Sequence, residues 1–189
     1  MFDPRCIAGY AIISEDGMLA NDAGIMPGSL KFDADRRFFE CGLDGVDVVV
    51  HGRHSDEQQP RSHLRRRLIL TRHVAAIAPD PSNDKALLWN PAGASFDEAL
   101  AAIGTPDASI GVIGGTEVFG MFLDRYDFFH LSRAPGVHLP GGRPVFPGVP
   151  KRTPEVMLAS HGLIPGRRQV LDPAKGLVVV SWQRSSKPD

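Results

Sequence analysis

The segment KFDADRRFFE, residues 31–40, contains two aspartates, Asp33 and Asp35, and either could donate or accept a proton in a reaction. At about 100° per residue around a helix, Asp35 shares a face with Phe38 and Phe39. Asp33 lies roughly 160° from Asp35, beside the arginines of the segment. Burial on an apolar face raises the pKa of a carboxyl group toward the range useful in acid–base chemistry. Asp35 is therefore the candidate acid, with a purely structural first-turn role as the alternative, and Asp33 is expected to be a solvated helix-start residue.

A glycine pair, Gly114–Gly115, stands between an apolar run and a helical pattern that begins at about Thr116. Glycines allow a ligand to approach the backbone closely, and the first amides of a helix are unpaired donors with partial positive charge. These properties suit an anion such as a pyrophosphate. A plain strand-to-helix turn is the alternative, because this pair is not a GxGxxG motif.

Two more apolar runs end in polar side chains that suit phosphate groups. VVVHGRHS, residues 48–55, ends in Gly52, Arg53, His54 and Ser55, and LILTR ends in Thr71 and Arg72. The carboxyl ends of parallel strands lie at one edge of a sheet, where α/β proteins bind ligands. With the glycine pair, these residues suit a nucleotide that has more than one phosphate group. Singly, each arginine is more often a surface residue.

Metal and disulfide chemistry are not expected. His51, His54 and His63 share no useful spacing with a carboxylate or a cysteine, so no metal site is predicted. Cys6 and Cys41 have neither metal-ligand nor CxxC spacing. Two unrelated thiols in a reducing compartment are favoured over a disulfide.

The elements that would position these residues alternate between strands and helices. Strand-like runs occupy residues 6–14, 46–52, 67–72, 86–89, 109–115 and 126–134, and helical patterns occupy 33–43, 95–104 and 116–125. Ser95 and Glu98 have the spacing of a capping box. Runs at 156–161, 167–172 and 176–184 suggest a terminal meander. The pattern predicts a three-layer α/β/α fold with a mostly parallel central sheet and an antiparallel C-terminal edge.

Composition is that of an ordinary globular chain: 189 residues, 42% apolar and 23% charged, with a formal net charge of -1. We expect one domain over residues 1–189. The charge provides no basic field for nucleic acid or an anionic membrane surface. Neither a signal peptide nor a membrane-spanning run is apparent, so a cytoplasmic protein is expected.

The motifs, taken in order, resemble the dihydrofolate reductase family. VVVHGRHS, LRRRLILTR, SFDEALAAIG, IGVIGGTEVF and FFHLSRA follow the family's order and spacing across about residues 6–147, and EDGMLANDAGIMP resembles its mobile active-site loop. The pyrimidine reductases of riboflavin synthesis share this fold, and SEDGMLA and DADRRFF resemble their segments. Their glycine pair usually follows an acidic residue, where this chain has Ile113. The cofactor half is thus more similar to dihydrofolate reductase, and the substrate half is mixed.

The resemblance implies NADPH as the cofactor and a pteridine or pyrimidine as the substrate. We expect a monomer or a homodimer. The implied cofactor-binding residues are Leu19, Ala20, Gly52, Arg53, His54, Ser55, Thr71, Arg72, Ile113, Gly114, Gly115, Thr116, Glu117 and Val118. Among these, Thr71 and Arg72 would contact the 2′-phosphate, and the Gly114–Gly115 peptide bond would be cis. The implied substrate-binding residues are Ile12, Met26, Leu30, Phe39, Arg65 and Ser132. Arg65 would bind the glutamate carboxylate of folate, and Ser132 would hydrogen-bond to the acid.

The implied activity is reduction of 7,8-dihydrofolate to tetrahydrofolate, with Asp35 assisting protonation. A riboflavin-pathway-type pyrimidine reductase and a catalytically inactive nucleotide-binding module are the alternatives. The choice of Asp35 over Asp33 assumes a two-residue insertion after IMPGSL. The chain has Gly28 where the family has a tryptophan and GGRPVFP where it has Gly-Asp-Thr before Phe-Pro. These departures bear on the substrate more than on the cofactor.

Overall fold

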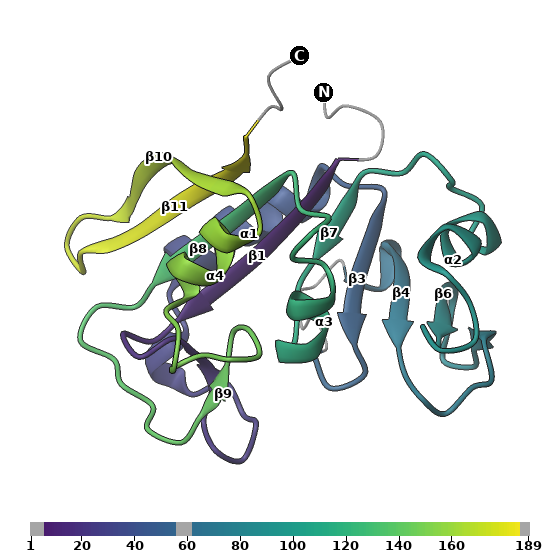
Figure 1. Cartoon of the computed structure of the whole chain (residues 1–189), viewed down its shortest axis with the longest axis horizontal. Helices are drawn as coiled ribbons and strands as arrows, with labels where there is room; N and C mark the ends of the chain where they lie inside the picture. Colours follow the sequence, from purple (N-terminus) through teal and green to yellow (C-terminus); the bar gives the residue numbers. More distant parts are fainter. Residues whose placement is uncertain (1–5, 56–61, 186–189) are drawn as a thin grey trace.

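The computed structural model describes residues 6–55 and 62–185 of the chain (Figure 1). The strands are β1 (Ile7–Ile13), β2 (Met18–Ala20), β3 (Val48–Gly52), β4 (Arg66–Leu70), β5 (Ile77–Asp80), β6 (Asn83–Trp89), β7 (Ile110–Val112), β8 (Phe128–Arg133), β9 (Arg143–Pro144), β10 (Leu163–Asp172) and β11 (Leu177–Arg184). The helices are α1 (Asp33–Asp44), α2 (Phe96–Ala102), α3 (Thr116–Met121) and α4 (Pro154–Ser160), with 3-10 turns η1 (Gly28–Leu30) and η2 (Ser62–Leu64).

A nine-stranded sheet in the order β10-β11-β8-β1-β7-β3-β4-β6-β5 forms the middle layer. The strands from β8 to β6 in this order are parallel to one another. Their carboxyl ends therefore meet at one edge, the lower edge in Figure 1. Strands β10 and β11 add the antiparallel C-terminal edge, which confirms the predicted fold class. Strand β5 makes a second antiparallel edge against β6, which the sequence did not predict.

Helices cover both faces of the sheet. In Figure 1, α3 and α4 lie in front of the sheet and α1 lies behind it. The front layer shares the largest apolar core, which includes Phe119 of α3, Met157 of α4 and Phe96 of α2. Behind the sheet, α1 contributes to two smaller clusters through Ala34 and Leu43. Within the described residues, no helix has the length and apolar character needed to cross a membrane.

Capping residues explain where two helices begin. Ser95 and Glu98 form the predicted capping box at the start of α2, each side chain bonded to the other residue's amide. Residues 156–161, which the sequence suggested as a strand, belong mainly to α4. Thr153 caps that helix, and Pro154 fits its first turn because its ring is compatible with helical φ and it has no N–H to leave unpaired.

Candidate active site

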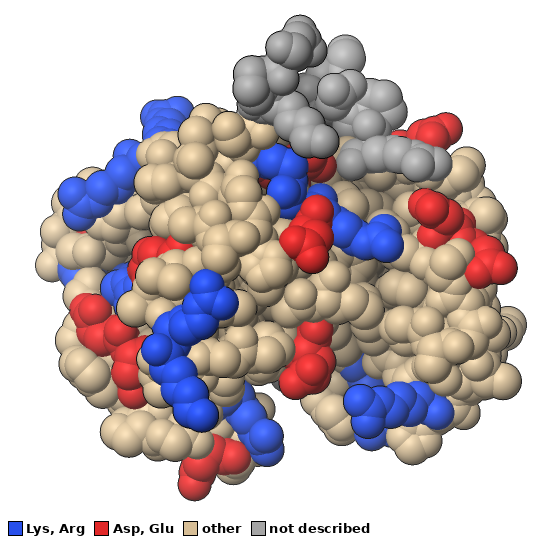
Figure 2. All heavy atoms as spheres, viewed as in Figure 1, with Lys and Arg blue, Asp and Glu red and all other residues tan. Residues whose placement is uncertain are grey.

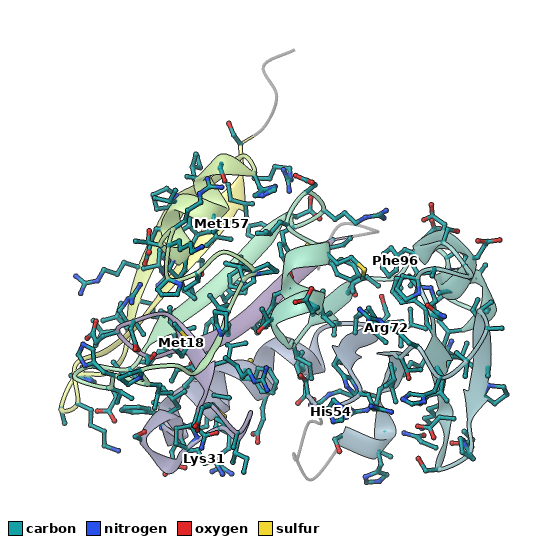
Figure 3. The ribbon with its side chains drawn as sticks, turned by 60° about the horizontal axis from the view of Figure 1, so that its bottom comes forward. Met18, Lys31, His54, Arg72, Phe96 and Met157 are labelled. Atoms are coloured by element: carbon teal, nitrogen blue, oxygen red, sulfur yellow. The ribbon has the colours of Figure 1, made fainter. Side chains whose placement is uncertain are left out.

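The carboxyl ends of the parallel strands face a hollow in the surface. Figure 2 shows the outline of the molecule notched at the lower edge, where Figure 1 places α3 and the carboxyl end of β3. Figure 3 brings this edge forward, with Met18 of β2 on one side of it and His54 and Arg72 on the other. The loops after β3 and β4 thus lie across this edge from β2, on the other side of the opening.

Asp35 and Asp33 occupy different environments at the start of α1. Asp35 is partly buried and accepts a hydrogen bond from Ser132; burial raises its pKa from 3.8 to about 6, and the bond from Ser132 opposes this rise. Asp33 is exposed, with 77% of its side chain accessible, and pairs with Arg36 at 3.2 Å. The arrangement gives the two carboxyl groups different chemistry: Asp35 can exchange a proton near neutral pH.

An apolar wall adjoins Asp35. Ser132 is 2% exposed and lies opposite Ile12 in the β1–β8 ladder. Ile12, Leu30 and Ala34 form one buried cluster, which places η1 and the first turn of α1 against the end of β1. Three of the predicted substrate-binding residues, Ile12, Leu30 and Ser132, therefore gather around the acid.

The two phenylalanines of α1 pack on Tyr10. Phe39 contacts the Tyr10 ring edge-on, with ring centroids 6.2 Å apart, in a cluster that includes Ile113. Phe38 packs against both Tyr10 and His130 and belongs to the same aromatic cluster. His130 stacks on Tyr10, and burial lowers the His130 pKa to about 4. The ring of His130 is therefore neutral at physiological pH.

The glycine pair joins the ends of β7 and β3. The peptide bond between Gly114 and Gly115 is cis, and Gly114 has φ +111°, a conformation that favours glycine. The Gly52 amide donates a 2.7 Å hydrogen bond to the Gly114 carbonyl oxygen. A Cβ atom at Gly115 would lie 3.2 Å from the hydroxyl oxygen of Ser55. A Cβ atom at Gly52 would make only ordinary van der Waals contacts, so the tight approach is the one at Gly115.

The loops after β3 and β4 lie side by side. The Arg53 amide donates to the Leu70 carbonyl oxygen at 3.2 Å, and the Thr71 amide donates to the Trp89 carbonyl oxygen at 3.0 Å. Arg72 is exposed, and the Arg53 guanidinium lies 3.2 Å from the ring of His54. The fold thus brings the cationic and hydroxyl groups of two strand ends to one side of the opening.

Thr116 links the glycine pair to β9 and β2, on the opposite side of the opening. Its hydroxyl donates to the carbonyl oxygen of Pro144 in β9, and β9 pairs with β2, so that Ala20 lies opposite Arg143. Leu19 packs against the main core. In the first turn of α3, Val118 is buried and Glu117 is exposed. Because α3 has six residues, its dipole is short.

Two predicted substrate residues lie outside this group. Arg65 stands at the amino end of β4, and its guanidinium donates a 2.6 Å hydrogen bond to Asp44. Asp44 is nine residues beyond Asp35 in α1, about 14 Å along the helix axis. Arg65 can therefore reach only the far end of a substrate whose ring contacts Asp35. Met26 is 40% exposed in the loop between β2 and η1.

Comparison with solved structures identifies the fold. Neither a protein-family model nor a curated protein matches the sequence. A dihydrofolate reductase from Enterococcus faecalis, complexed with NADP(H), aligns at a TM-score of 0.66 and 17% identity over 98% of this chain and 100% of that one. This chain has the dihydrofolate reductase-like fold. A putative riboflavin biosynthesis protein from Shewanella sp. PV-4 aligns at 0.64 and 21% over 96% and 99% of the two chains. A pyrimidine reductase-like protein from Corynebacterium diphtheriae aligns at 0.65 and 15% over 97% and 93%.

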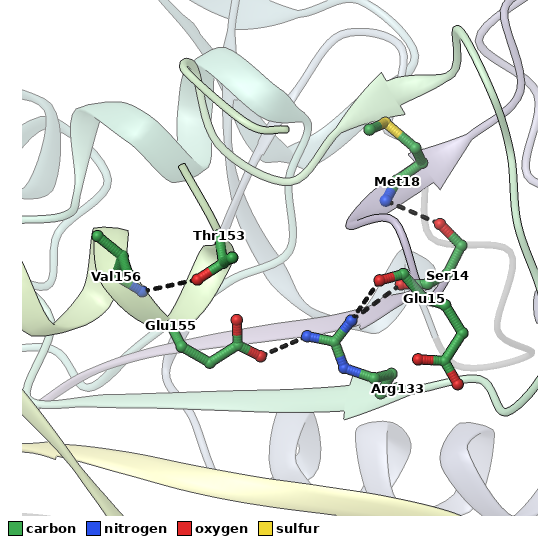
Figure 4. Close-up of polar contacts among 7 residues, drawn as sticks. All are labelled: Ser14, Glu15, Met18, Arg133, Thr153, Glu155 and Val156. Carbon is green, nitrogen blue, oxygen red and sulfur yellow. Dashed lines mark hydrogen bonds and ion pairs between the residues drawn. The ribbon is translucent and has the colours of Figure 1, made fainter. Parts of the chain in front are cut away.

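Within this dihydrofolate reductase-like fold, Arg133 makes contacts that the sequence does not indicate (Figure 4). It follows Ser132 in β8, contacts the carbonyl oxygens of Ser14 and Glu15, and pairs with Glu155. Glu15 and Glu155 are 118 and 22 residues away in the chain, so no local pattern reveals them.

Among the described residues, no three His, Cys, Asp or Glu side chains are placed to hold a metal ion.

Proposed function

We propose that the protein is an NADPH-dependent reductase that converts 7,8-dihydrofolate to tetrahydrofolate. The observation that carries the proposal is the partly buried carboxyl group of Asp35, bonded to Ser132 and with a pKa raised to about 6, at the sheet edge that also carries the glycine pair. An acid with this pKa exchanges protons readily at neutral pH. Its neighbours suit a ring that is apolar on its faces and polar at its rim.

The donor set fits NADPH. Gly52 and Gly115 leave room that a Cβ atom would fill, with Ser55 3.2 Å from such an atom at Gly115. Arg53 and Arg72 supply positive charge for phosphate groups. In this proposal Thr71 and Arg72 bind the 2′-phosphate, which makes NADPH preferred over NADH. When bound, this cofactor supplies a hydride to the substrate carbon.

The residues around Asp35 orient the substrate and handle the proton. Reduction of a C=N bond places the hydride on carbon and requires one proton on the adjacent nitrogen. Asp35 can hold that proton or pass it through a water, since nearly neutral pH populates both of its forms. The apolar side chains of Ile12, Leu30 and Phe39 exclude water from the ring and keep the pKa of Asp35 raised. Ser132 fixes the direction of the carboxyl group.

A second candidate is a pyrimidine reductase of the type found in riboflavin synthesis. The observation that favours it is the bond between Arg65 and Asp44, because an arginine already paired with a carboxylate binds a glutamate tail less strongly. The names of two structural neighbours, a putative riboflavin biosynthesis protein and a pyrimidine reductase-like protein, point the same way. In this case the arginines at the strand ends would also serve a substrate phosphate.

Steady-state oxidation of NADPH tests the proposal. Turnover is expected with 7,8-dihydrofolate and not with the ribosylaminopyrimidine phosphate of riboflavin synthesis. Turnover with the pyrimidine alone would replace the first candidate by the second. Tight NADPH binding without turnover of either compound would identify a nucleotide-binding module and refute the proposed catalysis.

A further inference from the structure

Arg133 holds the turn that leads from β1 into β2 (Figure 4). Its guanidinium donates a 2.8 Å hydrogen bond to the carbonyl oxygen of Glu15 and a longer one, 3.4 Å, to that of Ser14. The same group pairs with Glu155 in the first turn of α4. Only 31% of the Arg133 side chain is exposed, so these charge-assisted bonds are partly shielded from solvent.

Hydrogen bonds within and around this turn couple its position to that of β2. The Ser14 hydroxyl accepts from the Met18 amide at 2.9 Å and donates to the Asp16 carboxylate at 2.5 Å. The Gly17 carbonyl oxygen accepts from the Val145 amide at 3.0 Å. Movement of the turn would therefore shift Met18 and the strand that follows it.

From β2 the connected contacts continue to the glycine pair. Met18 lies opposite Pro144 in the β2–β9 ladder, and the Pro144 carbonyl oxygen accepts from the hydroxyl of Thr116. Thr116 follows Gly115 directly. One set of contacts thus runs from Glu155 through Arg133 to both sides of the opening, β2 on one side and the start of α3 on the other.

We propose that Arg133 is a positioning residue that holds the 14–20 segment, which is linked to the start of α3 through β9, and so fixes the opening between β2 and the glycine pair. Taking that opening as the nicotinamide end of the NADPH site rests on the proposed function. Successive side chains of β8 point to opposite faces of the sheet. Ser132 therefore supports Asp35 on one face, and Arg133 supports the 14–20 segment on the other. The proton-handling group and this opening are then aligned by one strand.

Arg133→Met tests this, because it keeps the apolar stem and removes every donor. Backbone hydrogen exchange of residues 14–20 is expected to become about tenfold faster, since local opening loses its opposing bonds. NADPH and NADH, measured by calorimetry, are both expected to bind about tenfold more weakly. Arg133→Lys keeps one charged donor and should recover part of both losses. Arg168→Met, the same change on exposed β10, should leave exchange and binding within about twofold.

Either of two results would overturn the proposal: unchanged exchange at residues 14–20, or faster exchange with undiminished NADPH affinity. An equal loss in Arg168→Met would also overturn it, because the effect would then be one of general charge. If the unaltered protein bound no NADPH, the proposed function would fail instead, and the exchange data would still decide whether Arg133 holds the loop.

Discussion

The Arg65 guanidinium donates a 2.6 Å hydrogen bond to Asp44, at the end of α1 opposite to Asp35. The Arg65 side chain is 10% exposed and that of Asp44 is 45% exposed, so the arginine is the more enclosed partner. A substrate carboxylate at this end of the helix would have to compete with Asp44 for Arg65. The pair therefore bears directly on which substrate the protein accepts.

Asp44→Asn is expected to favour substrates with a carboxylate tail. Removing the competing charge should lower KM for dihydrofolate by about threefold to tenfold, because charge-assisted bonds to arginine are strong. KM for a dihydropterin that lacks the glutamate tail should stay within about twofold. Steady-state kinetics on both substrates measures this, and Asp33→Asn, in an exposed pair with Arg36, is the control. Equal changes for both substrates would show that Arg65 does not contact the tail.

Ser132→Ala is expected to move the pH profile. Because the bond from Ser132 lowers the pKa of Asp35, its loss should raise that pKa above about 6. If protonated Asp35 is needed, kcat/KM falls as pH rises through its pKa, and this alkaline limb should shift upward by roughly half to one pH unit. The control is Ser181→Ala, which removes the hydroxyl bonded to His130. A downward shift, or an equal one in the control, would be inconsistent with the role given to Ser132.

Arg72→Ala is expected to reduce the preference for NADPH. A charge-assisted bond to phosphate is worth roughly 1.5–3 kcal/mol, so NADPH affinity should fall by about 10-fold to 100-fold. NADH affinity should change by less than about twofold. Calorimetric titration with each cofactor provides the comparison, with Arg167→Ala on exposed β10 as the control. A parallel loss for both cofactors would place Arg72 away from the 2′-phosphate.

Asp35→Asn is expected to stabilise the folded protein above pH 6. The Asp35 pKa rises from 3.8 to about 6 on folding, so the folded state binds more protons than the unfolded state between these values. The stability of the unaltered protein therefore falls as pH rises through this window. Asparagine avoids this loss. The unfolding free energy of the variant, relative to that of the unaltered protein, should therefore be up to about 3 kcal/mol higher at pH 8 than at pH 4. Urea unfolding of both proteins at both pH values measures this difference, and a difference that does not change with pH would mean that Asp35 is solvated.

Local periodicity was enough to predict several features of the fold. The 3.6-residue period separated Asp35 from Asp33, and the spacing of Ser95 and Glu98 marked the start of α2. Apolar runs located the parallel strands, because a strand buried on both faces has no polar alternation. These features depend on neighbours within one turn of helix or one strand.

Features that depend on distant partners could not be predicted in this way. Phe38 packs on Tyr10 and His130, which come from two different strands. Asp44 and Arg65 are 21 residues apart in the sequence. Arg133 bonds to Glu15, 118 residues before it, and to Glu155, 22 residues after it. Strand β5 contains Pro79 and is only partly buried, so its pattern resembles that of a loop.

Turnover of Asp35→Asn tests the central claim most directly. With saturating NADPH and 7,8-dihydrofolate at pH 7, kcat is expected to fall by at least about 100-fold, the usual contribution of a positioned acid or base. NADPH affinity should remain within about twofold, and Asp33→Asn should retain full activity. Undiminished turnover in Asp35→Asn, or an equal loss in Asp33→Asn, would contradict the assignment of Asp35 as the proton-handling acid.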